Sequence, residues 1–91
     1  MIELITISKT GEQWYLNKVI VNPQHIALVI ESLEYGRLLK EGKIDIGLDN
    51  NVQFSTIRMA SASGFDDFIA VGSPGTIMEK MNRNTKQLLK G

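Results

Sequence analysis

The residue types best suited to chemistry lie together in the turn Gly72-Ser73-Pro74-Gly75-Thr76, between a β-prone run and a helical run. The first amide hydrogens of a helix have no partner inside it, so a helix that starts at this turn can hold an anion. The two glycines would let the backbone approach a ligand closely, and Ser73 and Thr76 add hydroxyl donors. However, the Gly-Lys-Ser/Thr ending of a P-loop is missing, and Pro74 has no amide hydrogen to donate. We therefore interpret the turn first as a helix cap and second as a site for phosphate.

Side chains from other parts of the chain would have to complete such a site. Arginine has the planar fork that binds phosphate or carboxylate with two hydrogen bonds, which makes Arg58 and Arg83 the candidates to meet the turn. Trp14, Tyr15 or Phe65 could stack on a base if the ligand were a nucleotide. Each side chain also has an ordinary role, which is solvated charge for the arginines and strand packing for the aromatics. The sequence leaves both roles open.

Catalysis and metal binding lack the necessary residues. The chain has no cysteine, and His25 is its only histidine, so neither a thiolate nor a pair of histidines is present. Asp66 and Asp67 could bind a hard cation, but calcium takes six or more oxygen ligands. The sequence also shows no nucleophile with a matching base and no cofactor-binding motif. We therefore expect a protein that is not an enzyme and that uses no cofactor, metal or catalytic residue.

The composition is that of an ordinary folded domain, with 43% apolar and 22% charged residues. Ten basic side chains balance ten acidic ones, which makes binding to duplex nucleic acid unlikely, because duplex-binding proteins usually carry a basic excess. No apolar run is long enough to span a membrane, and the start Met1-Ile2-Glu3-Leu4 lacks the basic region of a signal peptide. We expect a cytoplasmic protein with no membrane contact.

The segments that must position the candidate residues are mainly short strands. β-Branched residues and alternating patterns predict strands, joined by Gly- and Asn-rich turns. The strands are expected over residues 1–8, 13–16, 19–21, 44–48, 52–56 and 68–71, with a small-residue loop over 60–64. The pattern is most regular around the turn Asp49-Asn50-Asn51, which predicts a hairpin of 44–48 with 52–56. The run 26–32 fits a strand or a helix, with its β-branched residues favouring a strand, and 33–41 fits a short helix or a loop.

The end of the chain predicts one amphipathic helix, over residues 73–90. Ser73 as N-cap places Pro74 at the first helical position, where proline is favoured. Thr76 as N-cap would instead form a capping box with Glu79. We prefer the first register. The expected fold is thus α+β: a single domain over residues 1–91, with a small antiparallel sheet or roll of about five to six strands and this helix at its C-terminal end.

Several short segments resemble the small FlbD-type proteins of flagellar gene clusters. The matching pieces are Thr6 to Gly11, Tyr15-Leu16-Asn17, Asn22-Pro23-Gln24-His25-Ile26, and Val71-Gly72-Ser73 with Glu79. The chain departs from the family's pattern over residues 33–51, where the family has a tight turn, and in a longer tail after Met81. The resemblance implies a small β fold. It implies no catalytic residues, because the family has none to transfer.

Three functions remain open for a chain with these features. A chain this small buries only a modest core, so we expect a homo-oligomer, and we place first a non-enzymatic binding protein that acts through protein–protein interaction. The second function is sequestration of a small anionic ligand, such as a signalling nucleotide, at the Ser73 helix start with the arginines. The third is binding of single-stranded nucleic acid, which small β domains with exposed aromatics perform.

Overall fold

The computed structural model describes the backbone of residues 1–90 and the side chains of residues 1–83. Over this range the chain forms a five-stranded antiparallel sheet with the strand order β2-β1-β5-β4-β3, two α-helices and one short 3-10 helix. The elements in chain order are β1 (Ile2–Thr10), β2 (Gln13–Val21), η1 (Pro23–His25), β3 (Ile26–Glu31), α1 (Leu33–Lys40), β4 (Phe54–Ser61), β5 (Gly64–Val71) and α2 (Pro74–Lys90).

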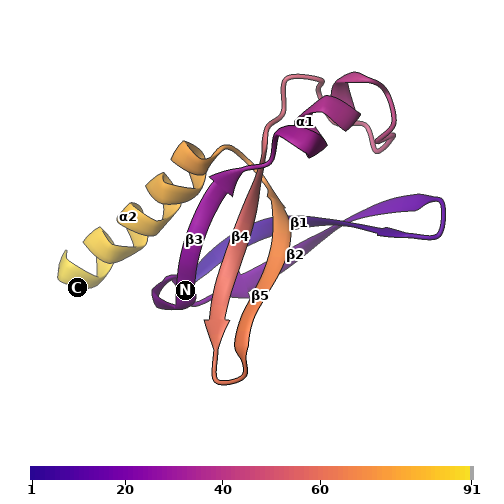
Figure 1. The fold of residues 1–91 in the computed structure, drawn as a ribbon. Coiled ribbons are helices and arrows are strands. Elements are labelled where there is room, and N and C mark those ends of the chain that lie inside the picture. Colours follow the sequence, from indigo (N-terminus) through magenta and orange to yellow (C-terminus); the bar gives the residue numbers. More distant parts are fainter. Residues whose placement is uncertain (91) are drawn as a thin grey trace.

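Two hairpins form most of the sheet. β1 and β2 pair along their whole length, from Ile2 with Val21 to Thr10 with Gln13. β4 and β5 pair from Phe54 with Val71 to Ser61 with Gly64, and β3 adds to the outer side of β4. The two hairpins join through only a short ladder between β1 and β5. Figure 1 shows the result: the β1–β2 hairpin crosses β4 and β5 steeply and projects beyond them.

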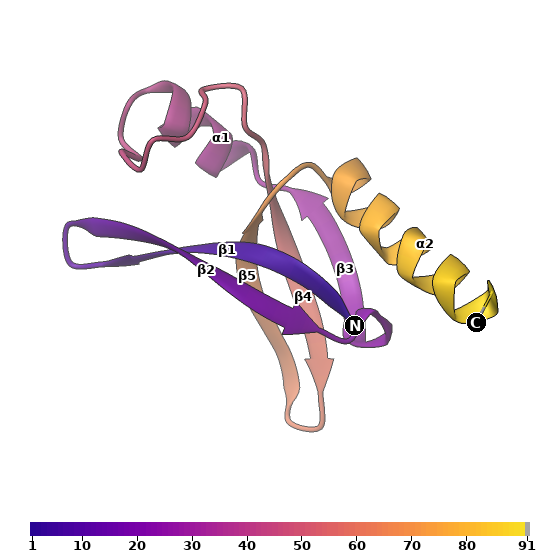
Figure 2. The same ribbon diagram turned by 180° about the vertical axis from the view of Figure 1, so that it is seen from behind.

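Helix α2 covers one face of the sheet. Residues directly opposite each other in antiparallel strands share a face, so the register assigns Leu4, Ala70 and Ile57 to the same side. These side chains form a buried cluster with Ile77 of α2 and with Ile2. Figures 1 and 2, which view the molecule from opposite sides, both place α2 alongside β3. The helix therefore packs on this side of the sheet, which we call the inner face.

A second core lies on the opposite face of the sheet, at one end of that face, under α1 and the segment that follows it. Leu39 of α1 and Ile44 are buried there with Ile7 and Phe54. The side chain of Trp14 borders this core and donates from its indole nitrogen to the carbonyl oxygen of Lys43 at 3.1 Å. The projecting β1–β2 hairpin is thereby tied to the α1 region.

The predicted hairpin of residues 44–48 with 52–56 is wrong. Residues 41–53 form no strand, and β4 starts at Phe54 and pairs with β3 and β5 instead. The alternation of Ile44, Ile46 and Leu48 has another cause, since all three pack into or against the second core while the residues between them are exposed. Gly47 also has a φ of 75°, which interrupts an extended strand.

Other expectations hold more closely. The fold has the expected small antiparallel sheet and C-terminal helix, with five strands. Residues 26–41 divide into strand β3 and helix α1, which are the favoured strand for the first part and the helical alternative for the second. The runs 13–16 and 19–21 belong to one continuous strand, β2. The expected loop over 60–64 is only the two-residue turn at Ala62 and Ser63, since β4 and β5 extend into it from both sides.

Candidate functional site

The turn before α2 is occupied by hydrogen bonds within the chain. The Ser73 hydroxyl accepts a hydrogen bond from the Thr76 amide at 3.2 Å, and the hydroxyls of these two residues lie 3.0 Å apart. Ser73 is thus the N-cap of α2, as in the register that we preferred from the sequence. Gly72 donates to the carbonyl oxygen of Gln53 at 2.7 Å, while its own carbonyl accepts from the buried Ser55 hydroxyl at 2.8 Å. These contacts fasten the start of α2 to β4.

The two candidate arginines do not meet this turn within one chain. Arg58 is level with Asp67, four residues before the end of β5 at Val71, which corresponds to about 13 Å along an extended strand. It also projects from the face of the sheet opposite to α2, as the register shows. Arg83 lies ten residues beyond Ser73, or about 15 Å along the helix, and forms an ion pair with Glu79 at 3.0 Å.

The three candidate aromatics lie in three different environments. Trp14 is half-buried against Tyr35, with ring centres 5.9 Å apart in an edge-to-face arrangement. Tyr15 points to the other side of β2 and donates from its hydroxyl to Gln13. Phe65 is 65% exposed, and the Arg58 guanidinium lies 6.0 Å from its ring centre. Arg58 and Phe65 are therefore the candidate arginine and the candidate aromatic that the structure brings together.

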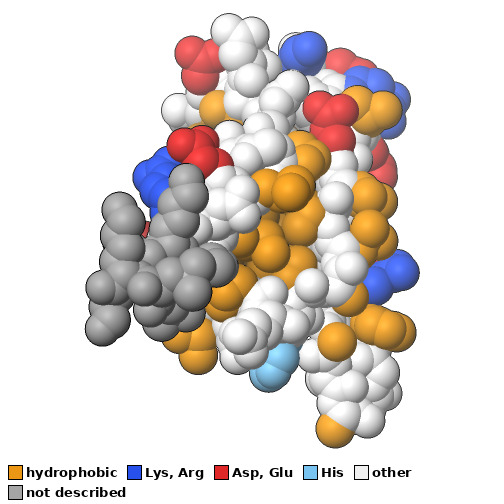
Figure 3. All heavy atoms as spheres, turned by 90° about the vertical axis from the view of Figure 1, so that its left-hand side faces the viewer, with side chains coloured by type: hydrophobic (Ala, Val, Ile, Leu, Met, Phe, Trp, Pro, Cys, Tyr) orange, Lys and Arg blue, Asp and Glu red, His pale blue; other side chains and the backbone are white. Residues whose placement is uncertain are grey.

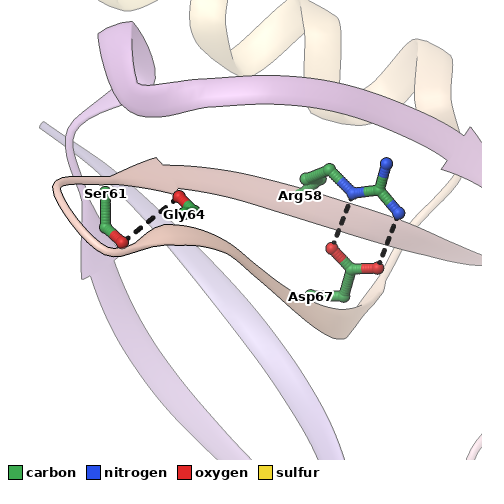
Figure 4. Close-up of polar contacts among 4 residues, drawn as sticks. All are labelled: Arg58, Ser61, Gly64 and Asp67. Carbon is green, nitrogen blue, oxygen red and sulfur yellow. Dashed lines mark hydrogen bonds and ion pairs between the residues drawn. The ribbon is translucent and has the colours of Figure 1, made fainter.

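Arg58 is held by a two-bond ion pair across the β4–β5 hairpin. Its Nε donates to Oδ1 of Asp67 at 2.9 Å, and its terminal Nη2 donates to Oδ2 at 3.1 Å (Figure 4). These hydrogen bonds lower the pKa of the Asp67 carboxyl and raise the pKa of the Arg58 guanidinium, because each favours the charged form of its partner. The fork of Arg58 is thus already filled by a carboxylate of the same chain.

Apolar side chains surround this ion pair. By the pairing register, one face of β3, β4 and β5 carries ten side chains; Phe54 and Val71, at one end, belong to the second core, and we call the other eight the outer face. The outer face consists of Leu28, Ile30, Thr56, Arg58, Ala60, Phe65, Asp67 and Ile69. Among these, Leu28 is 39% exposed and Ile30 49%, in addition to the exposed Phe65. Apolar side chains also gather on the side of the molecule where β3 forms the sheet edge (Figure 3).

Leu28 and Ile30 are site residues that the sequence reasoning missed, although a signal was present. The run Ile26-Ala27-Leu28-Val29-Ile30 is apolar without interruption, a pattern typical of strands that are covered on both faces. In the structure Val29 packs against the core under α2, whereas Leu28 and Ile30 point to the opposite, exposed face. The sequence of β3 is thus typical of a strand covered on both faces, whereas the structure covers only the face that carries Val29.

Open depressions lie elsewhere on the surface. One of about 380 Å³ is mainly apolar and is lined by Ile5, Leu16, Leu48 and Val71 among others. An open depression of about 530 Å³ lies between α1 and residues 51–54, lined by Arg37, Lys40 and Glu41 among others. Arg37 and Glu41 are 3.8 Å apart in it, as an ion pair along the helix. Among the described residues no group of three or more histidines, acidic residues or cysteines is placed to hold a metal ion. In the same part of the chain, no helix has the length and apolar character needed to cross a membrane.

Comparisons with protein-family models, with curated proteins and with solved structures found no match to this chain. The outer face is the described surface that carries exposed apolar side chains on three neighbouring strands. It combines an aromatic ring, two branched aliphatic side chains and an arginine whose charge is neutralised in place.

Proposed function

We propose that this protein is a non-enzymatic interaction domain that binds another polypeptide through the outer face of β3, β4 and β5. One observation carries the proposal: Leu28, Ile30 and Phe65 stand exposed around a paired charge on the sheet face opposite to α2. Singly exposed apolar residues are ordinary on protein surfaces, but these share one face of three neighbouring strands.

The residue types favour a protein partner over a phosphate ligand. The centres of protein interfaces are enriched in aromatic residues and arginine and depleted in other charges. Arg58 is bound by Asp67, so a phosphate group would have to displace a carboxylate that already forms two hydrogen bonds. A polypeptide can bury this neutral pair without bringing a charge of its own.

Site-specific photo-crosslinking tests the proposal. A photoreactive phenylalanine analogue replaces Phe65 in the cells that produce the protein, and the crosslinked polypeptides are identified by mass spectrometry. The matched control carries the analogue at Met78, which is 56% exposed on α2 and lies on the other side of the sheet. We expect adducts of defined mass from position 65 and none from position 78. Equal labelling from both positions, or none from position 65, would refute a binding role for the outer face.

A further inference from the structure

We infer that the polypeptide seated on the outer face is a second copy of this chain, stacked face to face about a two-fold axis near Arg58. This inference rests on the proposed function and names the partner of the same surface. It follows from the surface area of the chain, the charges of the outer face and the symmetry that a self-complementary surface requires.

The chain exposes more surface than a compact monomer of its mass. Its accessible surface is 6226 Å², whereas folded monomers of 10.2 kDa expose about 5,300 Å². The difference of about 900 Å² is spread over the whole chain, and it is large enough to accommodate one standard interface, which takes roughly 800 Å² from each partner. The radius of gyration agrees, at 14.0 Å against about 12.2 Å for a compact chain of this length. The projecting β1–β2 hairpin contributes to the difference (Figure 1), and the outer face supplies apolar surface that a partner would bury.

The charges of the outer face are compatible with binding to the outer face of a second copy of the chain. A two-fold interface places the same patch on both sides, so the patch has to complement itself. The outer face carries one arginine and one aspartate, and the chain has a formal net charge of zero, so two copies do not repel each other. Arg58 also lies on the middle strand, in the middle of three residue rows, with Leu28 and Asp67 beside it. A two-fold axis that runs along the strands between Arg58 and Asp67 brings Arg58 of each copy opposite Asp67 of the other.

Packing geometry supports stacking over other arrangements. Two sheets pack face to face at about 10 Å, with their strands roughly aligned, when apolar side chains fill the space between them. Stacking on the outer face gives strand β3 the second cover that its uninterrupted apolar run predicts. Pairing through the exposed edge of β3 would extend the sheet but leave Phe65, two strands away, without a partner.

Charge reversal separates this dimer from other assemblies. Arg58→Glu gives an outer face with two negative charges, and Asp67→Arg gives one with two positive charges. We expect the wild-type chain to sediment as a dimer of twice 10.2 kDa, and each variant alone to dissociate with a constant raised about tenfold or more. An equimolar mixture of the two variants should recover the dimer mass, because the negative face then meets the positive one. Circular dichroism of each variant confirms that it is folded.

A second pair of variants keeps the inference testable if charge reversal disturbs folding. Phe65→Ser should weaken the dimer about tenfold or more, and Met78→Ser should leave it unchanged. A wild-type monomer at all concentrations, a dimer insensitive to both Arg58→Glu and Phe65→Ser, or a mixture that stays monomeric would overturn the inference. The crosslinking experiment then decides the proposed function separately: adducts at position 65 to a different protein keep the function and refute self-association, whereas the absence of any adduct refutes both.

Discussion

Gly72 and Gly75 lie three residues apart in the turn before α2, and the structure predicts opposite effects for the same substitution at the two positions. At Gly72 the backbone φ is 124°, a conformation that side-chain-bearing residues rarely adopt. A Cβ atom there would lie 3.6 Å from the Ile77 side chain and 3.8 Å from that of Thr76, which are ordinary contact distances. The cost of Gly72→Ala is therefore the strain of the backbone, about 1–3 kcal/mol.

At Gly75 the same methyl group meets no obstacle. Gly75 lies in the first turn of α2 with no positive φ, and its nearest neighbour would be the Ser73 hydroxyl at 3.8 Å. Alanine has less freedom than glycine in the unfolded chain and favours the helix, so Gly75→Ala should stabilise the protein by about 0.4–1 kcal/mol. For a chain of this length, each kcal/mol moves Tm by about 4–8 °C, so the two variants should differ by at least 5 °C or so.

Thermal melts and urea titrations at equal chain concentration measure the Tm and the urea midpoint of both variants. Circular dichroism follows the whole fold, and the fluorescence of Trp14, the only tryptophan, follows the core under α1. Coincident transitions would support a two-state comparison. An unchanged midpoint for Gly72→Ala, or a loss of stability for Gly75→Ala, would show that the turn does not have the backbone geometry described. If inorganic phosphate raised the midpoint of the wild type but not of Gly72→Ala, the turn would be an anion site as well as a cap.

Three further predictions concern single side chains, each measured by urea denaturation. Ser73→Ala should lower the free energy of unfolding by about 1 kcal/mol through loss of the cap on the Thr76 amide, and Ser73→Asp should keep most of that stability. If the Asp variant were as unstable as the Ala variant, the result would argue against capping. Phe54→Ala should cost about 3–5 kcal/mol, because this ring is fully buried, and a cost below about 1 kcal/mol would contradict its place in the core. The pKa of Asp67 is lowered by Arg58, so the stability that this pair adds is present above a pH of about 4 and is lost as pH falls through the lowered pKa. The difference in midpoint between the wild type and Asp67→Asn should therefore shrink below that pH, and a difference that grows on acidification would refute the pairing.

Local signals in the sequence were sufficient for the elements that short-range chemistry determines. The turn at Gly11, whose φ is 62°, and the β-prone residues on both sides of it predicted the two strands that form the β1–β2 hairpin. Ser73 and Pro74 predicted the start of α2 to within one residue. In both cases the decisive contacts join residues that are close in the chain.

Alternation alone did not distinguish a strand from a loop that buries every second residue. The segment 44–48 has the pattern of a strand, but its apolar side chains face Leu39 and Phe54, which the sequence could not place. The contacts that decide its conformation come from elements far away in the chain, such as the bond from Trp14 to Lys43. A short helix at 33–41 was one of two expectations, and helix α1 gives the segment 44–48 a surface to cover.

The outer face was missed because its register depends on two turn residues. Arg58 and Asp67 are nine residues apart, and they face each other only if the hairpin turn is centred between Ala62 and Ser63. A longer loop over 60–64 leaves the register open and hides both this ion pair and the position of Phe65 beside Ala60. The turn residues Ala62 and Ser63 therefore decide whether Arg58 is free to bind an anion or is paired with Asp67.

The placement of α2 explains why the two candidate sites have different roles. α2 fills the inner face of the sheet through Ile77, and the Ser73 turn that leads into it is engaged by Ser55 and Gln53 beneath. A ligand at that turn would compete with the contacts that hold the helix in place. On the outer face, by contrast, the exposed side chains of Leu28, Ile30 and Phe65 can contact a partner without breaking any contact with α2, because they project from the opposite side. Binding at the outer face thus adds buried apolar surface to a small domain, whereas binding at the turn would compete with hydrogen bonds that hold the start of α2, and this asymmetry favours the outer face as the place of function.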